Sequence, residues 1–179
     1  MEMFYINIDN VTPNSRFYNG VLAHEFQHMI HWHNDRNEDT WLNEGFSELA
    51  THLNRFDIGG SDWLFADAPD TQLNSWPSGP GVAGPNYGAA YLFTSYFLDR
   101  FGSDATRALV AHPENSFTSV DEVLRDAGSD VAYQDLFADW VIANLLDDPG
   151  LGEGHYGYEN IDPPPVDVTT TYYANAYPV

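Results

Sequence analysis

The residues best suited to chemistry lie in "AHEFQHMIHWH", residues 23–33, which holds four histidines within ten positions. Residues four apart in a helix lie one turn apart on nearly the same face, so His24 and His28 can direct two imidazoles at one metal ion. The run "HEFQH" fits H-E-x-x-H, with Glu25 beside the metal. Alone, the match also fits an ordinary, partly buried helix face. The metal interpretation therefore needs further support, namely a third protein ligand.

A second motif supplies a candidate third ligand. A catalytic zinc site has three protein ligands and an open position for water. In "NEGFSE", residues 43–48, Glu44 follows His28 with enough chain between them for one helix to end and a second to run back beside the first. Glu48 lies one turn further on the same face, where its carboxylate can accept a hydrogen bond from a ligand histidine.

The two motifs together resemble the gluzincin metallopeptidases, the thermolysin-like group in which two His and one Glu bind zinc. "WLNEGF" is also similar to the aminopeptidase N family, and "AHEFQHMIHW" with "TWLNEGFSELA" most resembles the secreted hyicolysin-type neutral metallopeptidases of bacteria. The resemblance covers residues 20–56 and implies one catalytic zinc ion. It implies His24, His28 and Glu44 as zinc ligands, Glu25 as general base, and Glu48 and Asn43 as residues that support the ligands from behind.

The resemblance also implies a fold class. We expect an α+β protein that is mainly helical, a zincin-like catalytic domain with a reduced N-terminal sheet. One strand is expected over "MFYINID", residues 3–9, where apolar and polar residues alternate. The sequence departs from the family in two ways: Glu48 stands where the family more often has Asp, and the chain has room for one strand before the metal helix instead of several.

Helical spacing and capping residues predict the elements that position these side chains. We expect an active-site helix over about residues 15–33 and a Glu-ligand helix over about residues 40–56. Residues 57–86 are too rich in Gly and Pro for regular structure and predict a long loop. A helical C-terminal part is expected over residues 87–148.

The end of the sequence predicts a connection to something further. "IDPPPVDVTTTYYANAYPV", residues 161–179, is a proline-rich break followed by strand-like Thr and Tyr. We therefore expect a catalytic domain over residues 1–160, and a linker or strand over residues 161–179 that leads to a following domain of a longer protein.

The remaining histidines fit the metal site less well. A metzincin would have a third His where this chain has Asn34, and Gly where it has His31, so the sequence excludes that class. His31 and His33 are expected to be structural or solvated, because they lie further along the helix than the centre of the site. His52 and His112 are interpreted in the same way.

A tetrahedral oxyanion also needs a donor from a later segment. Tyr87 is the first candidate, because it stands where the long loop enters "YGAAYLF", and a similar Tyr precedes a helix in related aminopeptidases. The alternative is a core aromatic. His155 in "GEGHYGYEN" is the second candidate, with a surface loop histidine as its alternative.

These residues predict a zinc metalloendopeptidase acting on peptides or proteins. An aminopeptidase of this group has a G-x-M-x-N motif upstream of the zinc helix, and residues 1–23 contain none. Three alternatives stay open. They are an aminopeptidase fragment, an epoxide-type hydrolase of the same fold, and a non-catalytic zinc-binding or adhesion module. A purely structural zinc would not need Glu25 and would more often fill its fourth position with protein.

Composition limits the partners. The chain has 27 Asp and Glu against 6 basic residues, all Arg, and a net charge of −21, which excludes nucleic acid as an expected partner. No apolar run is long enough to cross a bilayer.

"NDRNED", "DAPD" and "LLDDPG" are candidate calcium loops, although none has EF-hand spacing. The absence of cysteine permits the cytoplasm and equally a bacterial exoenzyme, and the resemblance to secreted metallopeptidases favours a secreted or cell-surface bacterial or archaeal protein. The sequence carries no signal for an oligomeric state.

Overall fold

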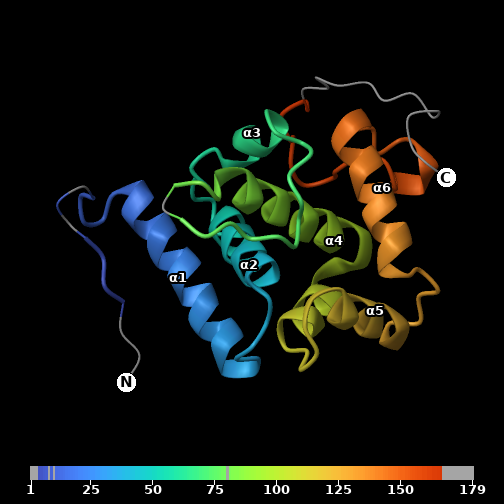
Figure 1. Cartoon of the computed structure of the whole chain (residues 1–179), viewed down its shortest axis with the longest axis horizontal. Helices are drawn as coiled ribbons and strands as arrows, with labels where there is room; N and C mark the ends of the chain where they lie inside the picture. The colour runs from blue at the N-terminus through green and yellow to red at the C-terminus, as the bar shows by residue number, and fades with distance from the viewer. Residues whose placement is uncertain (1–3, 8, 10, 80, 167–179) are drawn as a thin grey trace.

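The computed structural model describes residues 4–7, 9, 11–79 and 81–166, and within these ranges the chain is mainly helical, as expected (Figure 1). No residue in these ranges forms a strand. The elements are α1 (Arg16–Asn34), α2 (Thr40–Leu53), α3 (Ser61–Ala66), α4 (Gly84–Val110), α5 (Ser116–Asp126), α6 (Tyr133–Leu146) and a 3-10 turn, η1 (Gly152–Gly154).

The two helices that carry the motifs begin where the sequence predicts. Ser15 caps α1, because its side chain accepts a hydrogen bond from the backbone N–H of Tyr18 at 3.1 Å. The helix α2 begins at Thr40, after the extended backbone of Asp39. It ends at Leu53 instead of about residue 56, because Arg55 adopts a left-handed backbone with φ of 62°.

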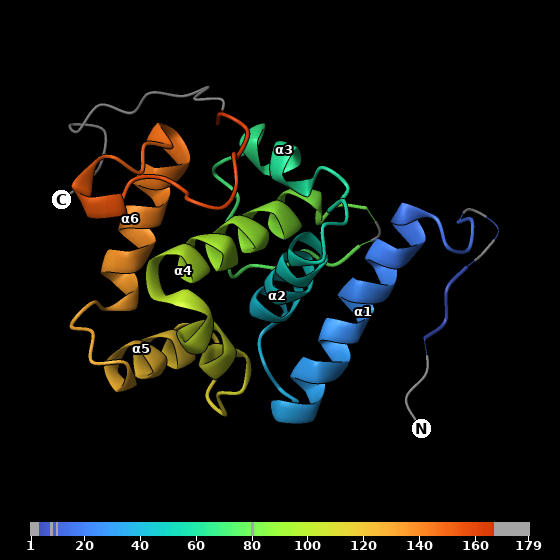
Figure 2. The same ribbon diagram turned by 180° about the vertical axis from the view of Figure 1, so that it is seen from behind.

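The long helix α4 forms the centre of the molecule and packs against α2 and α3 (Figure 2). Its inward side chains Phe93, Tyr96 and Phe97 are fully buried. At Gly45 the backbones of α2 and α4 approach so closely that a Cβ would lie 2.7 Å from the carbonyl oxygen of Ala90. This close approach fixes the position of the neighbouring residue, Glu44.

The helix α1 packs against α2 at the edge of the molecule (Figure 1). Its inner face includes the fully buried His31, whereas Phe26 and Trp32 are about half exposed. The histidine motif therefore lies along the junction between α1 and α2.

The strand expected over residues 3–9 is wrong for residues 4–7, which have no regular secondary structure. Met3 and Ile8 lie outside the described residues. A strand needs a neighbour to satisfy its backbone N–H and C=O groups, and the described part of the chain offers none.

The long loop predicted over residues 57–86 is wrong in part, because it contains α3 and because α4 already begins at Gly84. The side chain of Phe65 in α3 is buried and stacks on Trp140 with ring centroids 5.8 Å apart. This contact with α6 comes from a distant part of the sequence, so it offsets the poor local propensity of the segment.

The helical part predicted over residues 87–148 is confirmed by α4, α5 and α6. At Gly102 the helix α4 has a kink with φ of 76°, and helical turns continue beyond it to Val110. Residues 161–166 have no regular structure, and Pro163 and Pro164 are buried. Residues 167–179 lie outside the described residues, so the linker or strand expected there stays a prediction. No described helix has the length and hydropathy needed to cross a bilayer.

Candidate metal centre

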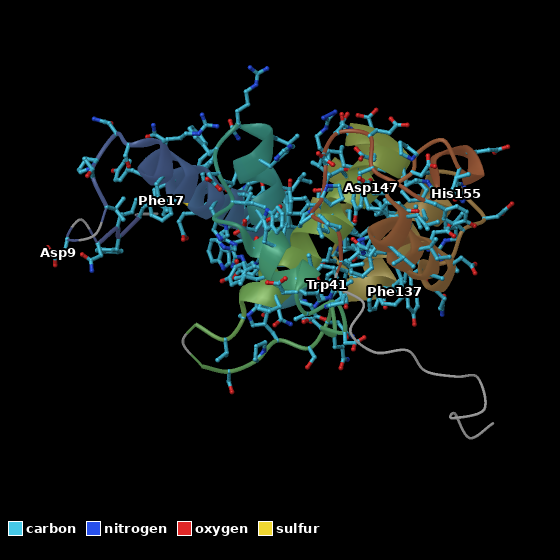
Figure 3. All side chains as sticks on the ribbon, turned by 90° about the horizontal axis from the view of Figure 1, so that it is seen from above. Asp9, Phe17, Trp41, Phe137, Asp147 and His155 are labelled. Atoms are coloured by element: carbon cyan, nitrogen blue, oxygen red, sulfur yellow. The ribbon has the colours of Figure 1, made fainter. Side chains whose placement is uncertain are left out.

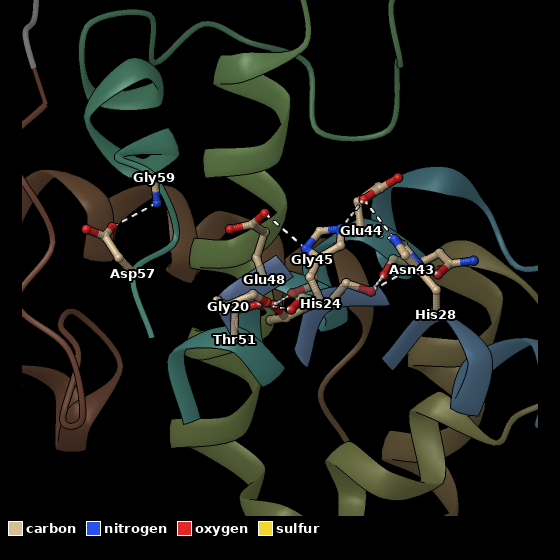
Figure 4. A network of polar contacts seen from close by, with 12 residues as sticks. Gly20, His24, His28, Asn43, Glu44, Gly45, Glu48, Thr51, Asp57 and Gly59 are labelled. Carbon is tan, nitrogen blue, oxygen red and sulfur yellow. Dashed lines mark hydrogen bonds and ion pairs between the residues drawn. The ribbon is translucent and has the colours of Figure 1, made fainter. Parts of the chain in front are cut away.

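Three side chains from α1 and α2 meet at one point (Figure 4). The Nε2 atoms of His24 and His28 lie 3.0 Å apart. Oε2 of Glu44 lies 3.2 Å from Nε2 of His24 and 3.3 Å from Nε2 of His28. The structure thus brings together the three residues that the sequence predicts as zinc ligands.

The spacing of these three atoms fits a zinc ion. Bonds of about 2.1 Å that meet at a tetrahedral angle separate neighbouring ligand atoms by about 3.4 Å. The observed separations are 3.0–3.3 Å. Oε2 of Glu44 is buried and makes no well-directed hydrogen bond despite these short distances. It is therefore aimed between the two rings, as a ligand of a shared cation would be.

Further residues hold the opposite side of each ring. Nδ1 of His28 donates to Oδ1 of Asn43 at 2.6 Å, and Oγ of Ser47 lies 3.0 Å from the same nitrogen. Nδ1 of His24 lies 3.3 Å from Oε1 of Glu48. With Nδ1 held in this way, each ring presents Nε2 to the cluster. Sequence reasoning missed Ser47, although its position one helical turn after Asn43 is a signal for this contact.

The cluster is strongly polarised. Burial by itself disfavours a charged imidazole, but Glu44 and Glu48 outweigh it and raise the pKa of His24 to about 9. Burial alone would also raise the pKa of Glu44, but its close contacts with the rings of His24 and His28 lower it to about 2. The pKa of His28 is raised too, because the effects of Glu44 and Asn43 exceed that of burial. A metal ion that bound here would therefore have to displace protons.

Two cavities adjoin the cluster, and Glu25 lines both of them. One, of about 270 Å³, is also lined by His24, Glu48 and Tyr87. The other, of about 540 Å³, is also lined by His28, by Glu44 and by Glu38 of the connection before α2. Glu25 thus lies beside the three candidate ligands and borders open space on both sides of them.

Of the two candidate oxyanion donors, the structure brings only Tyr87 to the cluster. Its ring lies 6.4 Å from that of His24 between centroids, and Trp76 packs against it at 5.0 Å. Burial, followed by the charges of Glu44 and Glu48, raises the pKa of Tyr87 to about 12, so the hydroxyl stays protonated at neutral pH. This neutral hydroxyl can donate a hydrogen bond into the smaller cavity.

The structure places His155 elsewhere. Its Nδ1 lies 3.1 Å from Oδ2 of Asp139 in α6, and its carbonyl oxygen accepts a hydrogen bond from Tyr96 at 2.6 Å. Figure 3 shows His155 at the opposite end of the molecule from Phe17 of α1. His155 is therefore not part of the metal centre, because η1 follows α6 on the far side of α4.

The other histidines lie outside the cluster. His31 is fully buried against Phe46, with ring centroids 5.8 Å apart, and burial lowers its pKa to about 4. His33 is exposed. His52 packs on Tyr91 in α4, at 5.8 Å between ring centroids.

No protein-family model and no curated protein matches this chain. The relationship to gluzincins therefore stays a proposal, supported by the two motifs and by the geometry of the residues they contain.

Proposed function

We propose that this chain is the catalytic domain of a zinc-dependent metalloendopeptidase of gluzincin type, secreted or displayed at the cell surface as part of a longer protein. The observation that carries the proposal is the convergence of Nε2 of His24, Nε2 of His28 and Oε2 of Glu44 within 3.3 Å of one another. Two imidazoles and one carboxylate leave a fourth position open, as catalytic zinc sites do.

The surrounding residues have the roles that peptide hydrolysis requires. Zinc held by His24, His28 and Glu44 would supply a water whose pKa is lowered to about 7 and a Lewis acid for the scissile carbonyl. Glu25 accepts a proton from the attacking water and delivers it to the leaving amine. The hydroxyl of Tyr87, protonated at neutral pH, donates a hydrogen bond to the carbonyl oxygen as negative charge develops on it.

The arrangement of the cavities favours an endopeptidase. The smaller cavity adjoins His24 and the larger one adjoins His28, so the chain has space next to both ligand histidines. An extended peptide could therefore continue on both sides of the scissile bond, whereas an aminopeptidase has to close one side around a free amine.

The proposal is tested by hydrolysis of unfolded casein. The zinc-loaded chain should cleave it, and activity should disappear on treatment with a chelator and return with added zinc. His28→Ala should lower zinc content and activity together. The matched control is His33→Ala, which removes an exposed histidine of the same helix and should change neither.

The type of peptidase is tested with a pair of short peptides that differ only in a blocked or a free N-terminus. An endopeptidase should cleave the blocked peptide at an internal bond. Release of single N-terminal residues from the free peptide alone would favour an aminopeptidase. Zinc binding without cleavage of any of these substrates would contradict the peptidase proposal and favour a non-catalytic zinc-binding module.

A further inference from the structure

A second group of potential metal ligands lies at the C-terminal end of α1. The side chain of His31 is fully buried, and neither of its ring nitrogens has a hydrogen-bond partner. Asp35, one turn further on, is also buried, and Glu38 lies in the connection to α2. One potential ligand atom from each of the three residues lies within 4.8 Å of the other two.

Each of the two carboxylates in this group accepts hydrogen bonds through one oxygen, and its other oxygen has no partner. Oδ1 of Asp35 accepts a hydrogen bond from the backbone N–H of Asn37 at 3.3 Å. Oε1 of Glu38 accepts from the backbone N–H groups of Asp39 at 2.6 Å and Ser116 at 2.8 Å. Oδ2 of Asp35 and Oε2 of Glu38 are buried without a partner. Hydrogen bonds that orient a carboxylate while leaving one oxygen available are typical of metal ligands.

An ordinary packing role does not account for this arrangement. Buried polar groups in proteins are nearly always hydrogen-bonded, and buried charges are nearly always paired. Here an imidazole and two carboxylate oxygens are buried together, and no Arg or backbone donor reaches the free oxygens. A single cation would provide a partner for all three residues at once.

We propose that His31, Asp35 and Glu38 bind a second divalent metal ion of the zinc class, distinct from the ion held by His24, His28 and Glu44. Calcium prefers ligand sets made of oxygen, whereas an imidazole with two carboxylates suits zinc and similar transition metals. Asp35 and Glu38 belong to "NDRNED", a loop that the sequence offers as a candidate for calcium, and the buried imidazole favours zinc instead.

The position of this site indicates a structural role. Its ligands lie on α1 and on the connection that leads to α2, and Glu38 also contacts the first residue of α5. The same connection is fixed to α5 by two hydrogen bonds between Asn37 and Asn115. Glu38 lines the 540 Å³ cavity, which gives an ion a path to the site. Bound there, the ion would fasten the C-terminal end of α1 to the connection that leads into α2 and to the start of α5.

Zinc stoichiometry tests the proposal. The metal-free chain is titrated with Zn²⁺ against a chromophoric chelator, and tightly bound zinc per chain is then measured by elemental analysis. The native chain should bind two equivalents. The pair His24→Ala and His28→Ala should leave one, and the pair Asp35→Asn and Glu38→Gln should also leave one. The matched control, Asp104→Asn with Glu114→Gln, changes two exposed carboxylates in the same way and should leave two.

Thermal unfolding gives a second readout. In the chain with His24→Ala and His28→Ala, Zn²⁺ should raise the melting temperature by several degrees, and adding Asp35→Asn and Glu38→Gln should abolish that rise. Ca²⁺ should have no such effect.

Two results would overturn the inference. The first is a folded chain with His24→Ala and His28→Ala that binds no zinc tightly. This result decides the question even if the chain with Asp35→Asn and Glu38→Gln does not fold. The second is stabilisation by Ca²⁺ but not by Zn²⁺. A different result would count against the proposed function alone. If only the site of His24, His28 and Glu44 failed to bind zinc, the native chain would bind one equivalent, and only the chain with Asp35→Asn and Glu38→Gln would lose it.

Discussion

His24 and His28 present Nε2 to the same point because neighbouring side chains hold the Nδ1 atom of each ring. The residues that do so differ between the two histidines. Asn43 and Ser47 contact His28, whereas Glu48 contacts His24. A carboxylate behind an imidazole increases its basicity, whereas an amide mainly orients it. The two ligands therefore differ in how strongly they hold a proton, and this difference is measurable.

Zinc binding should release a proton from His24 even in mildly alkaline solution. Its pKa of about 9 means that the ring is still largely protonated at pH values where an ordinary histidine is neutral. At about pH 8 the chain should release about one proton per zinc bound, and its zinc affinity should rise with pH until about pH 9. Calorimetry in buffers of different ionisation enthalpy measures the proton count. Glu48→Gln should reduce it, and an unchanged count in that variant would contradict the role of Glu48.

Tyr87→Phe tests the oxyanion donor. Loss of one such donor typically lowers kcat by about 100-fold or more, because it acts on charge that develops in the transition state. KM and zinc content should change little. Tyr5→Phe is the matched control, since Tyr5 is 87% exposed. A Tyr87→Phe enzyme with full kcat would show that the ring only packs against His24 and Trp76.

At the scale of helices, the geometry of the proposed zinc site depends on how closely α2 approaches α4. The hydroxyl of Thr94 donates to the carbonyl oxygen of Gly45 at 3.0 Å, and a side chain at Gly45 would collide with the backbone of Ala90. Because Glu44 precedes Gly45, a shift of α2 would also move a proposed zinc ligand.

Gly45→Ala should therefore destabilise the chain, although Ala is the better helix former by about 1 kcal/mol. Overpacking of this kind typically costs about 1–3 kcal/mol in the free energy of unfolding. Urea unfolding measures the change, and zinc affinity should fall with it. Gly150→Ala is the control, since its Cβ would meet nothing closer than a carboxylate oxygen of the exposed Asp148 at 3.1 Å. A stabilised Gly45→Ala chain would contradict the close approach.

The helices that local signals define could be predicted from the sequence, whereas features that depend on distant contacts could not. The helices α1 and α2 follow from capping residues and spacing, so the meeting of His24, His28 and Glu44 is foreseeable. The helix α3 depends on the packing of Phe65 on Trp140, which no local pattern shows. The expected strand has no partner among the described residues.

The second group of ligands was missed for a related reason. In the sequence, His31 looks like any histidine near a helix end, and "NDRNED" is a candidate calcium loop without EF-hand spacing. Only the folded chain shows that His31 and Asp35 are buried and that Glu38 turns toward them. The spacing H-x-x-x-D-x-x-E is the one signal that sequence reasoning could have used.

The whole molecule carries a net charge of −21, spread over a chain of 179 residues. Such an excess favours association with cations and repels nucleic acid, and it destabilises the compact state by self-repulsion. Each proposed metal site brings carboxylates close together. A metal ion bound there would therefore also reduce the repulsion between these carboxylates.

Salt should therefore stabilise the chain. Raising NaCl from about 0.05 M to about 1 M shortens the screening length to about 3 Å and should raise the melting temperature of the metal-free chain. An uncharged osmolyte at equal osmolality serves as the control for effects other than screening. A melting temperature that stays constant or falls with salt would show that the acidic residues are too dispersed to matter.

The most direct test of the central claim is the activity of Glu25→Gln. Glu25 lines both cavities beside the proposed metal ligands, and the amide has nearly the same shape but cannot accept the proton of an attacking water. With zinc content checked in both proteins, the native chain should hydrolyse casein, and Glu25→Gln should bind zinc equally well and lose at least about 100-fold in rate. Equal hydrolysis by both zinc-loaded proteins would contradict the account, because the cluster could then not be a peptidase centre with Glu25 as its base.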